Sequence, residues 1–168
     1  MSDRKFVSGL FNSRTAADAA VDAILKRGYT REEISVLMSD ATKNKEFALQ
    51  TKSQAAGGAG IGGAIGVAVG ATLAAIVAIG TAITIPPLGL VIAGPIAAAL
   101  AGAGAGGTTG GLIGALIGLG ITKHQAEVYD TGVREGGILI GVDARSDDEV
   151  DNLERMFEDL GAKHIHNE

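Results

Sequence analysis

The chain contains no cysteine and no tryptophan, and only 4% of its 168 residues are aromatic. Without cysteine there are no disulfide bonds, no thiolate catalysis and no cysteine-ligated metal sites. The net charge is −5 at pH 7 and no basic run is longer than Arg4-Lys5, so we expect no nucleic-acid partner. Residues 1–5 are polar and lack the apolar core and cleavage site of a secretory signal, which predicts a cytosolic origin.

The most informative absence is that of charge. No Asp, Glu, Lys or Arg occurs between Lys52 and Lys123, a run of 70 positions. This run holds 19 of the 26 glycines, whereas all 14 Lys and Arg and all 19 Asp and Glu lie outside it. We therefore divide the chain into a split charged domain, residues 1–52 and 123–168, and an apolar insert, residues 53–122.

The charged domain contains one pattern twice. Residues 6–11 and residues 138–144 are each typical of a strand, and each is followed by a serine that can cap a helix. The two helices run from Ser13 to Gly28 and from Ser146 to Gly161, with the same spacing and matching apolar positions. Both glycines suit the left-handed conformation that ends a helix.

A strand follows each helix, at residues 34–38 and at residues 163–166. The predicted order is strand-helix-strand, insert, strand-helix-strand. Two right-handed units of this kind pair into a four-stranded antiparallel sheet with both helices on one face. We therefore predict an α+β protein with a ferredoxin-like domain interrupted by the insert.

Small residues recur every fourth position in the insert, which on a helix makes a stripe that another helix can approach closely. We predict two antiparallel helices, at about residues 55–82 and 95–119, packed as a glycine-zipper hairpin. The candidate helix-packing residues are Gly58, Gly62, Gly66, Gly70, Gly94, Gly102, Gly106, Gly110, Gly114 and Gly118. The candidate turn residues are Pro86, Pro87, Gly89 and Pro95, because proline ends or begins helices and glycine allows turns.

At about 1.5 Å per residue, each predicted helix is roughly 35 to 40 Å long, which is enough to cross a bilayer. We predict a two-pass membrane segment with both termini cytoplasmic, because both ends of the hairpin return to one sheet. The hairpins would associate into a homo-oligomer that displays the α/β domain. One alternative is a soluble shell or filament, in which many hairpins bury one another; another is a small-ligand-sensing regulatory module.

A short helix is also predicted from Thr122 to Arg134, with Ala126, Tyr129 and Val133 on one face. It would join the insert to the third strand. Both Thr122–Gln125 and Ser146–Glu149 have the sequence of a capping box, in which the last side chain bonds back to the first backbone N–H.

Several segments together resemble the bacterial general stress or heat-induced stress protein family. They are Val7-Ser8-Gly9-Leu10-Phe11, Lys26-Arg27-Gly28-Tyr29, Ile34-Ser35-Val36-Leu37, Ile85-Pro86-Pro87, Ala93-Gly94-Pro95, and Tyr129 with Gly132-Val133-Arg134-Glu135-Gly136-Gly137. The resemblance covers nearly the whole chain. It implies a stress-associated, membrane-linked protein with a split α/β domain, and it carries no active-site residue over.

Other motifs are weaker. Residues 58–63 and 102–107 match the dinucleotide-binding glycine pattern, but the insert lacks the acidic residue that this pattern requires about 20 positions later. His164 and His166 are spaced to ligate a metal with Glu168, although solvent-exposed edge-strand histidines are the simpler interpretation. We expect no catalytic site, no cofactor and no metal.

Overall fold

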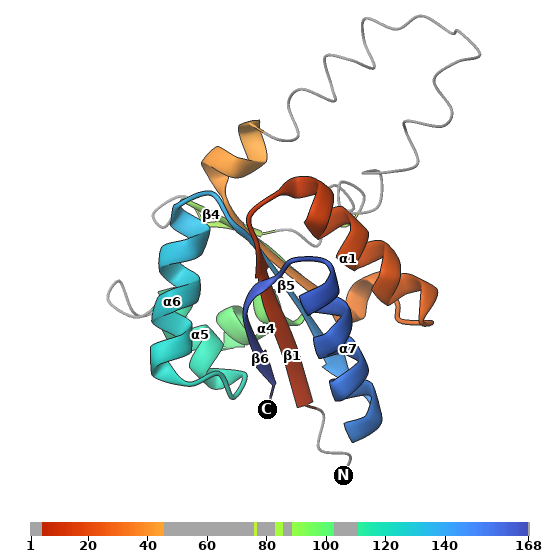
Figure 1. The fold of residues 1–168 in the computed structure, drawn as a ribbon. Helices are drawn as coiled ribbons and strands as arrows, with labels where there is room; N and C mark the ends of the chain where they lie inside the picture. Colours follow the sequence, from red (N-terminus) through yellow and green to blue (C-terminus); the bar gives the residue numbers. More distant parts are fainter. Residues whose placement is uncertain (1–4, 46–75, 77–82, 86–88, 103–110, 168) are drawn as a thin grey trace, which may run out of the picture.

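The computed structural model describes residues 5–45, 76, 83–85, 89–102 and 111–167. They form an α+β fold around a six-stranded antiparallel sheet (Figure 1). The elements are β1 (Lys5–Phe11), α1 (Arg14–Lys26), β2 (Ile34–Ser39), β3 (Ile83–Ile85), β4 (Leu90–Ala93), α4 (Pro95–Gly102), α5 (Gly111–Gly118), α6 (Lys123–Arg134), β5 (Ile138–Ala144), α7 (Asp147–Asp159) and β6 (Lys163–Asn167). A 3₁₀ turn at Arg31–Glu33 precedes β2, and residues 40–45 are helical.

The strand order is β3-β4-β2-β5-β1-β6, and every neighbouring pair is antiparallel. The two central strands, β2 and β5, therefore come from opposite sides of the insert, with Ile34 opposite Val142. On its other side β5 pairs with β1, where Val7 lies opposite Val142. β1 also pairs with β6, but the register shifts between Ser8 and Leu10. Glycine at position 9 fits this bulge, because a Cβ there would lie 3.0 Å from the Cβ of Ala162 and 3.1 Å from the Phe157 ring.

α1 and α7 cover one face of the sheet (Figure 1). Ser13 and Ser146 cap them by accepting hydrogen bonds from the N–H groups of Ala16 and Glu149. α1 buries small residues against the strands, whereas α7 buries larger ones, including Phe157, whose ring meets Phe11 edge-on at 5.5 Å. The predicted terminating glycines, Gly28 and Gly161, both have positive φ, at 89° and 81°. These helices form as the sequence predicts.

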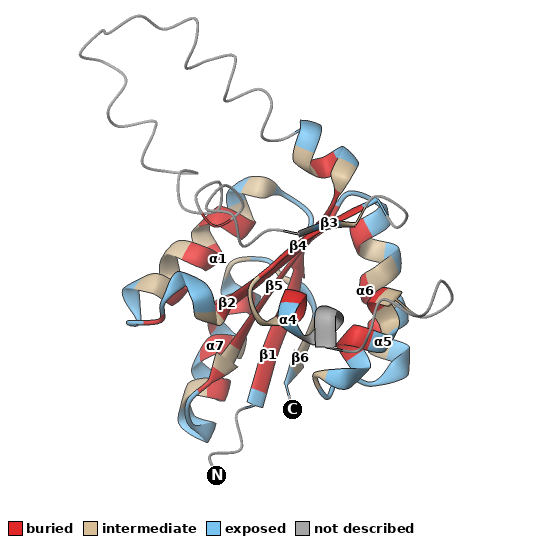
Figure 2. Cartoon of the chain, turned by 180° about the vertical axis from the view of Figure 1, so that it is seen from behind, coloured by how far each residue is buried: buried red, intermediate tan, exposed pale blue. Residues whose placement is uncertain are grey.

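α4, α5 and α6 cover the opposite face, and Figure 2 shows buried residues, in red, on the strands and on helices of both layers. The predicted apolar face of α6 is confirmed, since Ala126, Tyr129 and Val133 are buried there. α4 and α5 contribute Ile96, Ala97, Leu112 and Leu116 to the same core. The sheet is thus sandwiched between two helical layers, and the second layer includes part of the apolar insert.

The insert differs from the predicted helical hairpin. Residues 83–85 and 90–93, which the sequence predicts to lie in the connection between the two helices, form the β3–β4 hairpin at the edge of the sheet. β4 pairs with β2, so this part of the insert continues the sheet of the charged domain. The physical reason is composition: Ile83, Ile85, Val91 and Ile92 are β-branched and favour strands.

The predicted helix at 55–82 lies outside the described residues, except for Ile76. Of the predicted helix at 95–119, the structure describes α4 and α5, each eight residues long. Among the described residues, no helix is both long and apolar enough to cross a bilayer.

Candidate functional site

The predicted helix-packing glycines fall into three groups. Gly58, Gly62, Gly66, Gly70, Gly106 and Gly110 lie outside the described residues, as do Pro86 and Pro87. Gly102 is the last residue of α4. Gly94, Gly114 and Gly118 are described, but the structure does not place them in one stripe: the first lies against the sheet and the other two lie on the surface of α5.

Gly94 joins β4 to α4 with a φ of 81°, in the left-handed region. A Cβ at this position would lie 2.1 Å from the carbonyl oxygen of Ile34 and 3.0 Å from the Cα of Ser35. The Ser35 hydroxyl accepts a hydrogen bond of 3.2 Å from the backbone N–H of Ile96, next to this contact. Gly94 therefore lets the start of α4 approach the backbone of β2, which is a role different from the predicted helix–helix packing.

Gly114, Ile117 and Gly118 form the outward face of α5, which we call the α5 face. All three residues are exposed, and a Cβ on either glycine would meet no atom within 4 Å. Ile117 is the one exposed large aliphatic side chain among the described residues, at 45%. The other side of the helix is anchored, because Leu112 and Leu116 are buried. The face is thus held rigidly, is free of charge, and has room for a closely packed partner.

Two of the predicted turn residues are described: Gly89 lies in the β3–β4 connection, and Pro95 begins α4. Gly89, with φ of 62°, follows the segment between β3 and β4, and its N–H donates to the carbonyl of Ile85 at 3.0 Å. Its carbonyl accepts from the N–H of Asp40 at 2.7 Å, which links the hairpin to the end of β2. Pro95 is the first residue of α4, as predicted, and its fixed φ suits that position.

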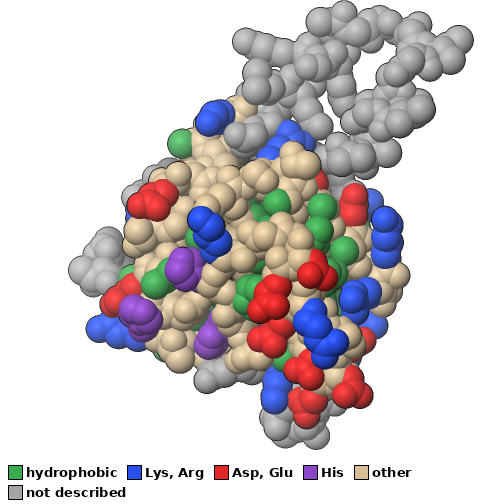
Figure 3. All heavy atoms as spheres, in the orientation of Figure 1, with side chains coloured by type: hydrophobic (Ala, Val, Ile, Leu, Met, Phe, Trp, Pro, Cys, Tyr) green, Lys and Arg blue, Asp and Glu red, His purple; other side chains and the backbone are tan. Residues whose placement is uncertain are grey.

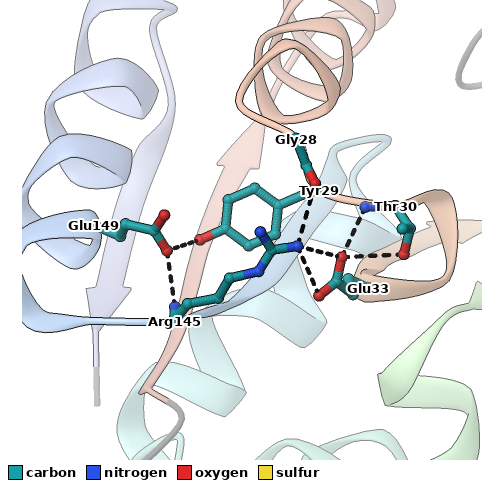
Figure 4. A network of polar contacts seen from close by, with 6 residues as sticks. All are labelled: Gly28, Tyr29, Thr30, Glu33, Arg145 and Glu149. Atoms are coloured by element: carbon teal, nitrogen blue, oxygen red, sulfur yellow. Dashed lines mark hydrogen bonds and ion pairs between the residues drawn. The ribbon is translucent and has the colours of Figure 1, made fainter.

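A polar network, not anticipated from the sequence, joins the two strand-helix-strand units (Figure 4). The Tyr29 hydroxyl donates a hydrogen bond of 2.5 Å to Glu149 at the start of α7. The Arg145 guanidinium lies 4.4 Å from the centre of the Tyr29 ring, and it donates to both carboxylate oxygens of Glu33 at 3.0 and 3.1 Å. We call Tyr29, Glu33, Arg145 and Glu149 the Tyr29 network.

The electrostatics of the Tyr29 network follow from these contacts. Burial, followed by the bond to Glu149, raises the pKa of Tyr29 to about 12. The Tyr29 hydroxyl in turn lowers the pKa of Glu149, while the backbone N–H of Thr30 is the main cause of the lowered pKa of Glu33. Each acid is therefore stabilised in its charged form and the phenol in its neutral form. This arrangement suits a fixed structural link, because none of these pKa values is shifted toward neutral pH, where a general acid or base would operate.

The predicted capping boxes are wrong in their second half. Glu149 accepts from the N–H of Arg145 at 3.0 Å instead of from that of Ser146. Gln125 donates through its side-chain amide to the carbonyl of His164 at 2.8 Å. Glu149 is bound instead by the Arg145 backbone and the Tyr29 hydroxyl, and Gln125 is bound to β6.

Tyr129 connects α6 to β1 and β6 through its buried hydroxyl. The Ser8 hydroxyl donates to it at 3.1 Å, and it lies within hydrogen-bond reach of the carbonyl oxygen of His164. Burial raises the pKa of Tyr129. His164 has a φ of 53°, the one positive φ among the described non-glycine residues. Such a backbone costs about 1–3 kcal/mol and persists only where the surroundings hold it, as the Tyr129 and Gln125 bonds do here.

The three histidines of the chain lie on one face of the molecule, over α6 and β6 (Figure 3). Acidic side chains gather over α7 on the same side, where the first helical turn contains Asp147, Asp148 and Glu149. In the part of the chain that the structure describes, no three His, Asp or Glu side chains are grouped so that they could hold a metal ion. A comparison of the chain with protein-family models, with curated proteins and with solved structures found no match.

Proposed function

We propose that this protein is a non-catalytic, stress-associated, membrane-linked protein that self-associates by close helix packing and displays an α/β domain in the cytosol. The observation that carries the proposal is the α5 face, on which Gly114 and Gly118 leave open space beside the exposed Ile117. A helix without side chains at i and i+4 lets a second backbone approach closely, which favours packing between helices. The occupant we propose is α5 of a second copy of the chain.

The charge distribution supports this occupant. All residues between Lys52 and Lys123 are uncharged, so two copies meeting through α5 bring no like charges of the insert together. An exposed apolar face rimmed by polar surface is typical of an interaction site. The helix behind the α5 face is also anchored, because Leu112 and Leu116 are buried in the core that α5 shares with α4 and α6, so the ordering cost of this face on association is small.

The membership of β2 and β3 in one sheet supports termini on one side of a membrane. β2 and β3 are both antiparallel to β4, which lies between them. With strands about 4.8 Å apart, the chain leaves and re-enters the sheet at strands roughly 10 Å from each other. Any excursion of residues 46–82 across a bilayer would then have to return to the side from which it left.

For the domain itself we propose a ferredoxin-like unit of β1-α1-β2 and β5-α7-β6. In its support, these four strands are adjacent in the order β2-β5-β1-β6, and α1 and α7 share one hydrophobic core. In this proposal, β3, β4 and the second helical layer are additions contributed by the insert and by α6.

The test of self-association is Gly114→Leu in the full chain, with Asn152→Leu on the exposed side of α7 as the matched control. Leucine is a better helix former than glycine by about 0.8–1 kcal/mol and meets no neighbour at position 114, so the fold is expected to be retained. We expect the Gly114→Leu protein to dissociate into smaller particles by sedimentation velocity, whereas the control keeps the particle mass of the unmodified chain. An unchanged mass for Gly114→Leu would refute the α5 contact.

Membrane association is tested separately, by fractionation of expressing bacteria and an alkaline carbonate wash. Retention in the washed membrane is expected. Release as a large, lipid-free particle would instead favour the soluble shell or filament. That alternative has one structural observation in its favour, because α4 and α5 of the insert are packed on the sheet of the domain.

A further inference from the structure

A polar hollow of about 750 Å³ lies between α6 and the β1–β6 edge of the sheet. We call it the α6–β6 pocket. Its charged and imidazole lining consists of Lys45, His124, Glu127, Glu135, Lys163 and His164. The volume is within the range of about 300–1,000 Å³ that small-molecule sites occupy in proteins. Gly132, Gly136 and Gly137 form part of the wall and add no side chains to fill it.

The backbone is shaped so that two consecutive residues of β6 line this pocket. Successive side chains of a strand normally point to opposite faces of the sheet. Lys163 and His164 nevertheless both line the α6–β6 pocket. The positive φ of His164 and the register shift of β6 against β1 account for this break in alternation.

Two hydrogen bonds hold the backbone of His164 in this conformation. The carbonyl of His164 is bound by the Tyr129 hydroxyl and by the side-chain amide of Gln125, both from α6. The lining helix therefore fixes the strained residue that faces it. Strain maintained by specific partners is a feature of binding and catalytic sites more often than of plain surface.

The charges in the pocket are of both signs, and most have no ion-pair partner in the part of the chain that the structure describes. Among the described residues, Lys45, Lys163 and Glu135 form no ion pair or side-chain hydrogen bond. Glu127 has only a long contact of 3.9 Å with the exposed Lys123. Two ammonium groups and two imidazoles suit a carboxylate, and two carboxylates suit an ammonium group.

We propose that the α6–β6 pocket binds a small zwitterion of the α-amino acid class. Lys45, Lys163 and the imidazoles of His124 and His164 face its carboxylate, and Glu127 and Glu135 face its ammonium group. This site is independent of the α5 face, so the proposal does not rest on self-association.

The experiment is isothermal titration calorimetry of the full chain with a panel of amino acids, together with their N-acetyl and carboxamide derivatives and inorganic phosphate. We expect at least one free amino acid to bind, and each derivative to bind at least tenfold more weakly, because each lacks one of the two charges. No binding by any amino acid at 10 mM would overturn the proposal. Phosphate binding as tight as that of the best amino acid would overturn it in favour of a simple anion site.

Substitutions in the lining identify the pocket as the place of binding. Lys163→Gln and Glu135→Gln are each expected to weaken binding at least tenfold, while Lys26→Gln, at the end of α1 on the opposite layer, leaves it unchanged. Thermal unfolding of all three proteins should match that of the unmodified chain, since these side chains are exposed. Equal affinities for Lys163→Gln, Glu135→Gln and Lys26→Gln would place the ligand elsewhere.

The variant His164→Gly distinguishes the contribution of the imidazole to binding from the cost of the strained backbone. Glycine adopts positive φ without strain, so this variant should unfold at a higher temperature than the unmodified chain and yet bind the amino acid more weakly. Retained affinity in a stabilised His164→Gly protein would mean that the strained residue serves no ligand.

Discussion

Gly94 offers a decisive test of how the insert is joined to the sheet. In Gly94→Ala the new Cβ would lie 2.1 Å from the carbonyl oxygen of Ile34, with a φ of 81°. The left-handed conformation costs a non-glycine residue about 1–2 kcal/mol. Relieving the collision costs about 1–3 kcal/mol more, because the atom to be displaced belongs to the backbone of β2. The sum predicts a loss of roughly 2–5 kcal/mol in the free energy of unfolding.

Two other glycines separate these contributions. Gly28→Ala has the same backbone strain, with φ of 89°, but no atom within 4 Å, so it should cost only about 1–2 kcal/mol. Gly114→Ala has neither penalty and lies in a helix, so it should stabilise the monomer by up to about 1 kcal/mol. Urea unfolding followed by circular dichroism measures all three. If Gly94→Ala costs no more than Gly28→Ala, the inferred contact between α4 and β2 is wrong.

The remaining predictions concern buried polar groups. Tyr29→Phe should lower the free energy of unfolding by about 1 kcal/mol at pH 7, because Glu149 loses its phenol donor. The pKa of Glu149 is lowered in the folded state, so the stabilisation from the Tyr29–Glu149 bond is present above the ordinary pKa of 4.5 and is lost as pH falls through the folded pKa. Urea titrations in which Tyr29→Phe lowers the free energy of unfolding equally at pH 7 and pH 3 would contradict this. The pKa of Asp18 is raised, chiefly by burial, so its ionisation reduces stability as pH rises from 3.8 through the folded pKa. Asp18→Asn should therefore gain in melting temperature, relative to the unmodified chain, between pH 3 and pH 7, and a relative loss would show that the nearby Arg14 outweighs burial.

The α+β class and the two strand-helix-strand units could be predicted because their signals are local. Ser13, Gly28, Ser146 and Gly161 mark helix ends within a few residues of the apolar patterns that they bound, and the helices and strands appear where those patterns lie. The secondary structure of the insert was harder to predict, because glycine and alanine spaced every four residues satisfy a helix pattern without requiring a helix. The β-branched residues of β3 and β4 were the available signal, but each strand is only three or four residues long.

The candidate sites depended on contacts that no local pattern records. Tyr29 and Glu149 are 120 positions apart, and His164 and Tyr129 are 35 positions apart, so neither pair is visible in a window of sequence. His164 carries no sign of a positive φ, because the partners that enforce it belong to another element. Gly94 and Gly114 look alike in the repeat, yet one is packed against β2 and the other is open to solvent.

The position of β1 between β5 and β6 also determines when this part of the sheet can form during synthesis. Val7 pairs with Val142, and β1 has its other neighbour in β6, so both partners are translated long after it. At about 5–20 residues per second, a ribosome needs roughly 6–25 s to pass from β1 to β5. The whole uncharged run between Lys52 and Lys123 is made during that wait. The pairs β2–β4 and β3–β4 can form while the insert is being made, whereas the pairs of β1 with β5 and β6 can form only after the insert is complete.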